Sequence, residues 1–514
     1  MNVRHQVGVC VTALAVGSLW LTSAAQQIDL PPGTRRVVSE TTAGAIDRGL
    51  RQNDALAAPR GSREGASAIS GEPFLRGSVI VKFRQGVSSV ARTAMLGRVS
   101  ALAVSRATNA DFDLVQIDAN ANPETVARTL ASQPDVEYAH ARYLVHPMFV
   151  PNDPLYSHQW NFPAIDMERA WDINPGSDAS IIVAVIDTGI AFRNQVVQFN
   201  SSFPFTDGTN VFQPLGVVQV PFAAAPDLGA SGRVVSPRDF IWSDTVPVDL
   251  DGHGTHVAGT IGQLTNNGVG VAGMAFNVKF MPVKVISGDW DFIFGSPHEG
   301  TDDIVAQGIR YAVDNGAKVL NMSIGRDGPP APVVEAAVAY AVSKGAFVVV
   351  AAGNGFEDGN PAEALAEFAP KIDGMVSVGA IGRNRSRAYY SSVGSYVELS
   401  APGGDQRQGG TEGGILQQTY DLDLVNTFLD GPAHFVAPRF DSFAYQYFQG
   451  TSMATPHVSG FAALLMQQGI TSPAAIEAVM KHYATDLGAG GPDDEYGYGL
   501  INPRAALRGM GLVK

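Results

Sequence analysis

Four polar residues in this chain have the side chains that acyl transfer requires: Asp187, His253, Asn354 and Ser452. A serine hydroxyl is a weak nucleophile until an imidazole accepts its proton, and the resulting imidazolium needs a carboxylate that fixes its tautomer and stabilises its charge. A carboxamide and the backbone N–H of the serine can donate hydrogen bonds to the developing oxyanion. The four types together therefore predict an acyl-transfer site.

The segment around Ser452 predicts a favourable environment for such a nucleophile. Residues 450–457 precede the apolar, helix-compatible run 458–466. Pro456 fits only where a helix has just begun, because proline in a helix interior removes a donor and clashes. Ser452 then lies at a helix N-terminus, where free N–H groups and the helix dipole favour negative charge.

The surrounding segments predict how these residues are positioned. Apolar strands at 181–186, 318–322 and 346–350 alternate with helices at 304–313 and 333–342. This order predicts an α/β fold, a doubly wound, mostly parallel sheet with helices on both faces. Asp187 and Asn354 follow two of the strands, and His253 starts a small-residue helix. Ligands of such sheets bind beyond the carboxyl ends of the strands, so we expect these side chains to meet there.

Composition limits the classes of partner. The chain has 514 residues, of which 45% are hydrophobic and 16% charged, which predicts a globular protein with a large core. Residues 1–150 carry 15 Lys and Arg against 12 Asp and Glu, whereas the remainder carries 20 against 37. An acidic main domain argues against nucleic acid or an anionic membrane as partner.

The N-terminal segment predicts export. Residues 1–25 have basic residues, an apolar run and a small-residue cleavage site, which is typical of a signal peptide. The mature chain is then secreted, with no membrane anchor and no disulfide, because Cys10 is the only cysteine. Residues 26–72 lack periodicity and predict a flexible linker. Residues 73–148 predict a small α+β domain, and 149–514 the large domain.

The motifs Asp187-Thr188-Gly189, His253-Gly254-Thr255-His256 and Gly450-Thr451-Ser452-Met453-Ala454 resemble the signature blocks of the subtilisin-like serine proteases, the subtilases. The resemblance covers roughly residues 150–506. It implies that Asp187, His253 and Ser452 form a catalytic triad and that Asn354 is the oxyanion donor. It also implies two substrate-binding segments, Ser323-Ile324-Gly325, which would pair with an extended peptide, and Ala351-Ala352-Gly353.

The same resemblance implies where the protein acts, on which substrates, and how it matures. The protein would be a secreted, monomeric endopeptidase that acts on protein and peptide substrates. Residues 73–148 resemble the subtilase propeptide, an intramolecular chaperone and inhibitor. We expect self-cleavage between Val145 and Asn152. The alternative is a catalytically inactive binding protein of the same fold.

Calcium is the structural cofactor that the resemblance implies in place of disulfides. Asp153 and the loop residues Leu264, Asn267, Val269 and Val271 match a calcium site built from hard oxygen ligands. One aspartate of the family site has no counterpart after Asp187, so an insertion residue is expected to replace it. Asp239 and Asp244 align with a second site.

Two further features remain open at this stage. Residues 191–238 and 405–448 predict irregular surface insertions of unassigned role. The loop after Asn354 carries four acidic residues, and any of them near the S1 pocket would favour a basic P1 residue; they are Glu357, Asp358, Glu363 and Glu367.

Other site classes fit less well. An aspartic protease needs two Asp-Thr-Gly motifs, and an α/β-hydrolase needs Gly-x-Ser-x-Gly and the order Ser, Asp, His. Residues 268–273 match a dinucleotide fingerprint but do not follow a strand. His256 and His457 lack a third metal ligand, so we expect them to be structural.

Overall fold

The computed structural model describes residues 34–40, 74–143, 149–207, 209–229 and 232–511. The predicted signal peptide, most of the predicted linker 26–72 and residues 144–148 of the predicted cleavage region lie outside these ranges. None of the helices in the described part of the chain combines the length and apolar character needed to span a bilayer.

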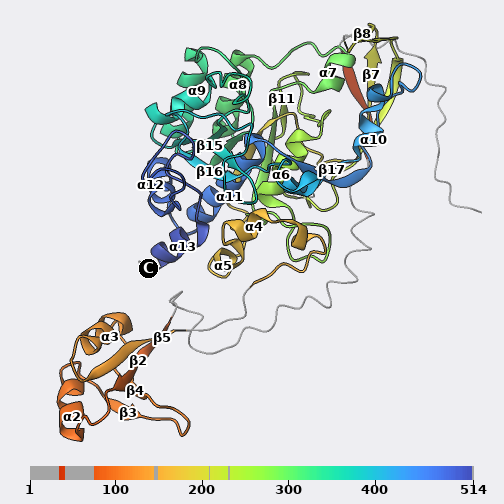
Figure 1. Ribbon diagram of the computed structural model, residues 1–514. Coiled ribbons are helices and arrows are strands. Elements are labelled where there is room, and N and C mark those ends of the chain that lie inside the picture. The colour runs from red at the N-terminus through yellow and green to blue at the C-terminus, as the bar shows by residue number, and fades with distance from the viewer. Residues whose placement is uncertain (1–33, 41–73, 144–148, 208, 230–231, 512–514) are drawn as a thin grey trace, which may run out of the picture.

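The large domain is built on a seven-stranded sheet in which every paired neighbour is parallel (Figure 1). Its strands, in spatial order, are β11 (Arg238–Asp239), β12 (Lys279–Lys284), β6 (Ile182–Asp187), β13 (Val319–Met322), β14 (Phe347–Ala351), β15 (Met375–Ile381) and β16 (Leu399–Pro402). The central strands are apolar along their length because both faces are covered. The predicted doubly wound α/β fold is confirmed.

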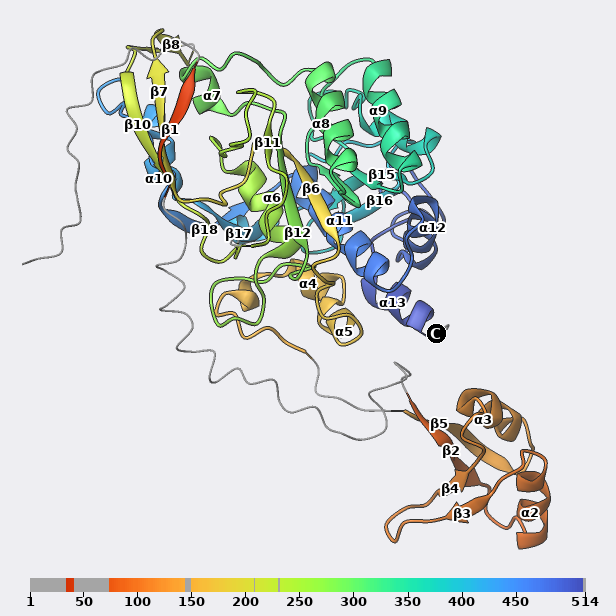
Figure 2. The ribbon, with the colours of Figure 1, turned by 180° about the vertical axis from the view of Figure 1, so that it is seen from behind.

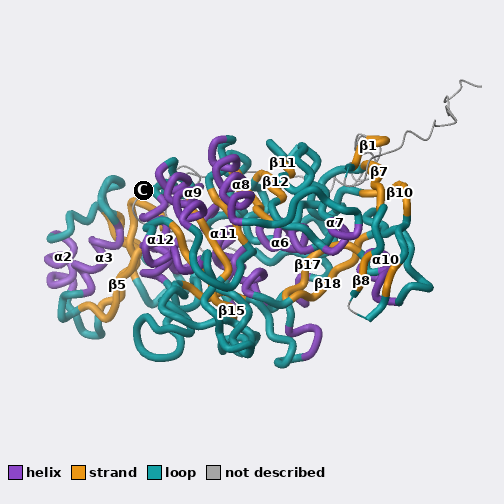
Figure 3. Tube along the Cα trace, turned by 90° about the horizontal axis from the view of Figure 1, so that it is seen from above, coloured by secondary structure: helices purple, strands orange, loops and turns teal. Residues whose placement is uncertain are grey.

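Two pairs of helices cover the sheet. Helices α6 (His253–Gly262) and α11 (Thr451–Gln467) pack on each other, and α11 contacts β13 to β16. Helices α8 (Asp302–Asp314) and α9 (Pro332–Ser343) pack on each other and contact β6, β12 and β14 (Figure 3). The remaining helices are α4 (Asn161–Ala164), α5 (Met167–Trp171), α7 (Asp289–Ile293), α10 (Leu422–Val425), α12 (Pro473–Tyr483) and α13 (Pro503–Gly511).

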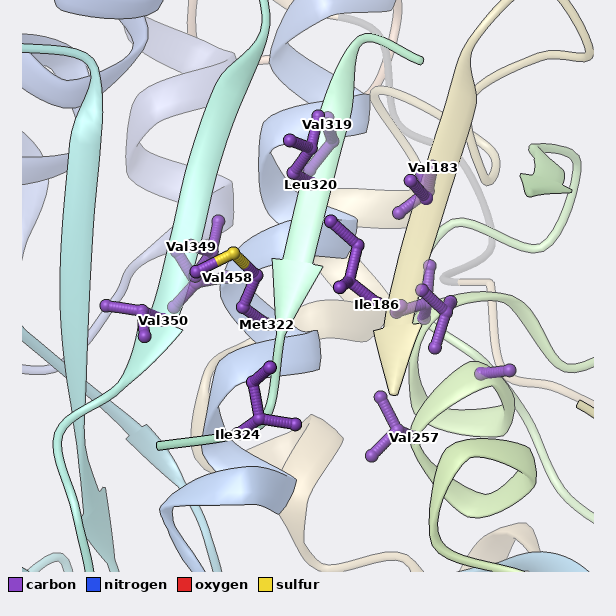
Figure 4. Close-up of a cluster of buried hydrophobic side chains, with 14 of the residues drawn as sticks. Val183, Ile186, Val257, Val319, Leu320, Met322, Ile324, Val349, Val350 and Val458 are labelled. Atoms are coloured by element: carbon purple, nitrogen blue, oxygen red, sulfur yellow. The ribbon is translucent and has the colours of Figure 1, made fainter. Parts of the chain in front are cut away.

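The core fixes how the strand ends and the site helices face one another. Figure 4 shows Ile186 from β6, Met322 from β13 and Val350 from β14 beside Val257 of α6 and Val458 of α11. All five side chains are fully buried. Apolar burial of this kind contributes about 1.5–3 kcal/mol per large side chain. The interlocked core therefore holds the start of α6 and the start of α11 at the carboxyl edge of the sheet.

The N-terminal domain is a four-stranded antiparallel sheet with two helices (Figure 1). Its elements are β2 (Phe74–Phe83), α2 (Ser89–Gly97), β3 (Ala103–Ser105), β4 (Asp113–Gln116), α3 (Pro123–Ala131) and β5 (Val136–Tyr143). Alternating residues of β2, including Val79 and Val81, pack on Met95 and Leu130 in a core of their own. The predicted α+β unit is confirmed.

The two insertions are more regular than the sequence predicts. In the first, β7 (Gln195–Ser201) pairs with β10 (Gly216–Phe222), and β8 (Phe205–Thr206) pairs with β9 (Val211–Phe212). In the second, β17 (Ile415–Tyr420) pairs with β18 (Phe443–Phe448), and β17 packs on α6. The expectation of irregular structure was wrong because pairing across a long connection leaves no local turn signal.

The predicted linker also needs correction. Residues 34–40 contain strand β1 (Arg35–Glu40), which pairs antiparallel with β7 (Figure 2). The sequence of β1 alternates only weakly between apolar and polar residues, and its order comes from a partner about 160 residues away. The flexible-linker prediction was therefore wrong for this segment.

Candidate active site

Asp187 and His253 meet at the carboxyl end of β6. Asp187 is the last residue of that strand and His253 is the first of α6. Asp187 Oδ1 lies 2.7 Å from His253 Nδ1, and it also accepts a hydrogen bond of 2.7 Å from the Thr188 N–H. The carboxylate is fully buried and the imidazole is 25% exposed. The carboxylate thus holds the Nδ1–H tautomer and leaves Nε2 available to accept a proton.

Asp249 holds these two elements together, although no sequence motif singles it out. Its buried carboxylate accepts hydrogen bonds from the Thr188 hydroxyl at 2.9 Å, from Gly252 N–H at 2.8 Å and from the hydroxyl of Thr255 at 2.6 Å. Thr188 follows β6, whereas Gly252 and Thr255 belong to the start of α6. One carboxylate therefore fixes the loop after Asp187 against the turn that carries His253.

Carboxylates around His253 set its protonation. Burial by itself lowers the pKa of the imidazole, but the charges of Asp187, Asp251 and Asp249 outweigh this effect and raise the pKa above its ordinary value. Asp251 also accepts a hydrogen bond of 3.0 Å from the His253 N–H. The neutral imidazole that can accept a proton is consequently favoured at alkaline pH.

Ser452 is the second residue of α11, as the prediction of a helix N-terminus requires. Pro456 has no N–H for the Ser452 carbonyl, which instead accepts a hydrogen bond of 2.8 Å from Ser323 Oγ. Ser452 Oγ donates to the carbonyl of Ser323 at 3.2 Å. The hydrogen bond between a nucleophile and its base is often long in a structure without substrate and tightens only when substrate binds.

Asn354 follows β14 and is exposed to solvent. Its Oδ1 accepts hydrogen bonds from the backbone N–H of Thr451 at 2.8 Å and from the hydroxyl of Thr451 at 2.9 Å. Because Oδ1 accepts both bonds, the other terminal atom of the Asn354 side chain is the donor Nδ2. The same bonds hold the side chain beside the start of α11. Asn354 can therefore donate towards the same point as the free N–H groups at that helix end.

The two predicted substrate-binding segments lie side by side because they extend neighbouring parallel strands. Residues 323–325 follow β13 and residues 351–353 end and follow β14. The carboxylate of Glu363 lies against Gly325, where any side chain would collide with it, and Glu363 Cβ lies near Gly353. Among the four acidic residues of this loop, Glu363 is thus the one placed between the two segments.

Glu357 and Glu363 differ in environment. Glu363 is 6% exposed and accepts a hydrogen bond of 2.6 Å from the Arg326 N–H. Burial raises the pKa of Glu363 to about 7. Glu357 is exposed and pairs with Arg407 at 2.6 Å. A buried carboxylate between the substrate segments can select for charge, whereas the exposed pair cannot.

His256 and His457 are structural, as expected. His256 Nε2 lies 3.1 Å from the carbonyls of Ile415 and Gln446, and its ring stacks on Phe448. His457 Nδ1 lies 2.9 Å from the Met453 carbonyl. Burial lowers the pKa of His256 to about 3 and that of His457 to about 4, so both rings are neutral.

The first predicted calcium region contains two buried carboxylates. Asp153 accepts hydrogen bonds from the N–H groups of Asn266 and Asn267. Asp227, from the first insertion, accepts from Asn267 Nδ2 at 2.9 Å and from the Val271 N–H at 3.1 Å. Asp227 is fully buried, and burial raises its pKa to about 7, with a contribution from Asp153. No Lys or Arg in the described residues forms an ion pair with either carboxylate.

This arrangement fits a hard cation. Two carboxylates without a positive partner and a loop that offers carboxamide and carbonyl oxygens are the donors that Ca²⁺ prefers. Asp227 belongs to the first insertion and is the candidate for the insertion residue that the sequence analysis expects in place of the missing aspartate. The described residues hold no group of three or more His, Cys, Asp or Glu side chains placed to bind a metal, so the carbonyl oxygens of Leu264, Val269 and Val271 would have to complete the set.

Asp239 and Asp244, the residues of the predicted second calcium site, both contact a guanidinium in this structure. Arg35 fills the position: its Nη2 lies 2.5 Å from Asp239 Oδ2 and 2.9 Å from Asp244 Oδ1. The guanidinium already supplies the positive charge that the two carboxylates require. The sequence could not reveal this because Arg35 lies some 200 residues away.

Comparisons with known proteins show which family the chain belongs to. A family model described as the subtilase family matches residues 178–499, and one described as the fervidolysin N-terminal prodomain matches residues 61–141. The thermophilic serine proteinase of Bacillus sp. (strain AK1) is 31% identical over 458 residues, covering 88% of this chain and 93% of that protein.

An extracellular protease of Xanthomonas campestris pv. campestris is 29% identical over 465 residues, covering 87% of this chain and 71% of that protein. Among solved structures, a protease from Pseudoalteromonas arctica PAMC 21717 superposes with a TM-score of 0.52 at 28% identity, covering 70% of this chain and 99% of that one. The family match covers more than half of the chain, and the relatives are named proteinases. The chain therefore belongs to the subtilase family and is a serine protease with an N-terminal prodomain.

Proposed function

We propose that this protein is a secreted endopeptidase that cleaves proteins through an acyl-enzyme formed on Ser452. The observation that carries the proposal is the 2.7 Å contact between Asp187 Oδ1 and His253 Nδ1, at the sheet edge where Ser452 and Asn354 also lie. The relatives named as proteinases support it, and they weigh against the alternative of an inactive binding protein.

The chemistry follows from these positions. His253 Nε2 takes the proton of Ser452 Oγ as that oxygen attacks the peptide carbonyl. Asn354 Nδ2 and the Ser452 N–H donate to the oxyanion, and Asp187 stabilises the imidazolium. The imidazolium then gives its proton to the leaving amine. Water, deprotonated by the same imidazole, hydrolyses the acyl-enzyme and restores the serine.

Export and maturation complete the proposal. Residues 1–25 have the composition of a signal peptide, and a relative is named an extracellular protease. The prodomain would inhibit the enzyme until the chain cuts itself between Val145 and Asn152. A parallel sheet rich in non-local contacts folds slowly, so a template domain is of use to an exported enzyme.

The test combines a serine-directed inhibitor with intact mass. Wild-type protein is expected to lose about its first 145–151 residues, to digest casein, and to gain one inhibitor adduct that peptide mapping places on Ser452. Trimmed protein that is inert towards casein and takes no adduct would overturn the proposal.

Loss of the oxyanion donor is expected to reduce turnover. Asn354→Ala should lower kcat by about 10²–10³-fold with little change in KM, because the amide acts on the oxyanion rather than on the ground-state substrate; the magnitude is that known for subtilisin. Steady-state kinetics on a chromogenic peptide measures it. An unchanged kcat would exclude Asn354 from the oxyanion site.

Glu363 is expected to favour Lys and Arg at P1. Its carboxylate form predominates above its pKa of about 7, so the ratio of kcat/KM for Lys over Phe substrates should rise as pH increases through 7. Glu363→Gln should abolish this rise, whereas the exposed Glu357→Gln should preserve it. A P1-varied peptide series measures the ratio. Preference for Phe or Leu at every pH would refute the assignment.

Calcium is expected to stabilise the loop around Asn267. Bound to Asp153, Asp227 and Asn267, the ion would neutralise two buried carboxylates that otherwise repel each other. A chelator should therefore lower the thermal midpoint of the mature enzyme, and Asp227→Asn should lose most of that sensitivity. An unchanged midpoint in the wild type would discard the site.

A further inference from the structure

Strand β1 places the region before the prodomain on the catalytic domain. Arg35 pairs with Phe199, Val37 with Val197 and Glu40 with Gln195, so β1 adds a third strand beside β7 (Figures 1 and 2). Strands β7 and β10 belong to the first insertion of the catalytic domain. Without β1, β7 would be an edge strand with unpaired backbone groups.

The side chain of Arg35 is inserted into a pocket of oxygen atoms. Its Nη2 donates to Asp239 Oδ2 and to the Val246 carbonyl, both at 2.5 Å, and to Asp244 Oδ1 at 2.9 Å. Its Nε donates to Asp244 Oδ2 at 3.1 Å. The guanidinium also lies 5.0 Å from the centre of the Trp242 ring.

Burial makes this contact different from an ordinary surface ion pair. The Arg35 side chain is 3% exposed, Asp239 is fully buried, and Asp244 is 37% exposed. Exposed pairs contribute little to binding. Removing one partner of a buried pair leaves an uncompensated charge, so departure of Arg35 from Asp239 is strongly opposed.

Two weaker contacts lie along the same strand. Arg193 pairs with Glu40 at 3.0 Å, and Arg36 donates to Gln198 Oε1 at 2.7 Å. Arg36 is exposed, so it differs from its neighbour Arg35 in burial while carrying the same charge. The chain thus contains its own matched control.

We propose that β1 is an anchor that keeps the cleaved N-terminal fragment bound to the catalytic domain, with Arg35 as its main contact. The inference rests on the proposed self-cleavage, which cuts the chain after both β1 and the prodomain. The prodomain then remains linked to a strand that is docked on the enzyme. Such a link raises its effective concentration at the active site and prolongs inhibition after the cut.

Docking is first measured without cleavage. In the full-length Ser452→Ala precursor, hydrogen exchange should show protected amides in residues 35–40. Adding Arg35→Ala should remove that protection, and adding Arg36→Ala should leave most of it. Rapid exchange of residues 35–40 in the Ser452→Ala precursor would overturn the docking itself.

Retention is then measured on self-cleaved protein carrying a C-terminal affinity tag and quenched with a serine-directed inhibitor. The N-terminal fragment should stay with the wild type and with Arg36→Ala. It should dissociate at least ~10-fold faster from Arg35→Ala and from Asp244→Ala, which removes a partner on the catalytic side. If the Arg35→Ala precursor folds poorly, Asp244→Ala alone tests the same contact.

The possible outcomes distinguish the anchor proposal from the proposed protease function. Cleavage followed by equally fast loss of the fragment from the wild type and from Arg35→Ala overturns the anchor and leaves the protease function intact. Failure of the wild type to cut itself counts against self-cleavage and with it the anchor's role in retention, while the exchange data still decide whether β1 docks.

Discussion

Ser452→Ala is expected to leave the precursor at full length and to lower kcat by about 10⁶-fold, a magnitude known for subtilisin. The variant removes the only atom that forms the acyl-enzyme, while α11 begins as before because alanine is a good helix former. What survives is the stabilisation offered by Asn354 and by the N–H groups at the start of α11, which act without a nucleophile.

Intact mass and casein digestion measure this loss directly. Ser343→Ala, at the exposed end of α9, is the control: it changes the same side chain at a distance and should mature and digest casein like the wild type. If Ser452→Ala is trimmed to the wild-type mass yet remains inactive, another protease matures the chain. If it is trimmed and digests casein, Ser452 is not the nucleophile.

The sequence predicted the elements that carry the site because each has a local signature. The apolar run before Asp187 is that of a strand buried on both faces, and Pro456 places a helix start next to Ser452. Parallel strands bring their carboxyl ends to one edge, so the meeting of Asp187 with the segments after β13 and β14 follows from their order. The core in Figure 4 then fixes the distances.

The features that escaped prediction depend on contacts between distant segments. Asp249 joins the end of β6 to the start of α6, yet in sequence it is one acidic residue in a loop. Asp227 lies about 40 residues from Asn267, inside an insertion whose pairing has no turn signal. Arg35 lies in a stretch of low periodicity. In each case the partner of a buried charged residue is determined by the tertiary fold, and the spacing of residues along the sequence does not indicate it.

The prediction of a second calcium site meets the same limit. Asp239 and Asp244 form an oxygen-lined pocket, and the sequence alone shows that a cation suits it. A guanidinium meets that demand as well as a metal does, because both supply positive charge to hard oxygens. Only the position of Arg35 distinguishes the two.

Asp187→Asn is expected to lower kcat by about 10⁴-fold at neutral pH while the fold is preserved. Asparagine is isosteric with aspartate, but a single oxygen, Asp187 Oδ1, faces both the Thr188 N–H and His253 Nδ1. An amide whose Nδ2 takes that position donates to Nδ1 and so cannot hold a proton there. The tautomer with the proton on Nε2 then competes, and that tautomer cannot accept the proton of Ser452.

The pH dependence gives this prediction its second readout. His253 acts as a base only when it is neutral, so the raised pKa of the wild-type imidazole places the acid limb of kcat above pH 6.5. Asp187→Asn removes the main charge that raises this pKa, and the limb should move to lower pH. The wild-type and Asp187→Asn precursors can be refolded from denaturant in parallel at a series of pH values. Intact mass then gives the rate of self-cleavage of each at each pH.

Asp251→Asn tests whether the carboxylates act on His253 through their negative charge or through the hydrogen bond that orients its ring. Asp251 raises the pKa of His253 but contacts only its backbone N–H. Its replacement should therefore move the acid limb to lower pH while kcat at the plateau stays near the wild-type value. If Asp251→Asn lowers the plateau as far as Asp187→Asn does, the carboxylates act mainly through their summed charge. If only Asp187→Asn lowers it, the hydrogen bond to Nδ1 is the part that catalysis requires.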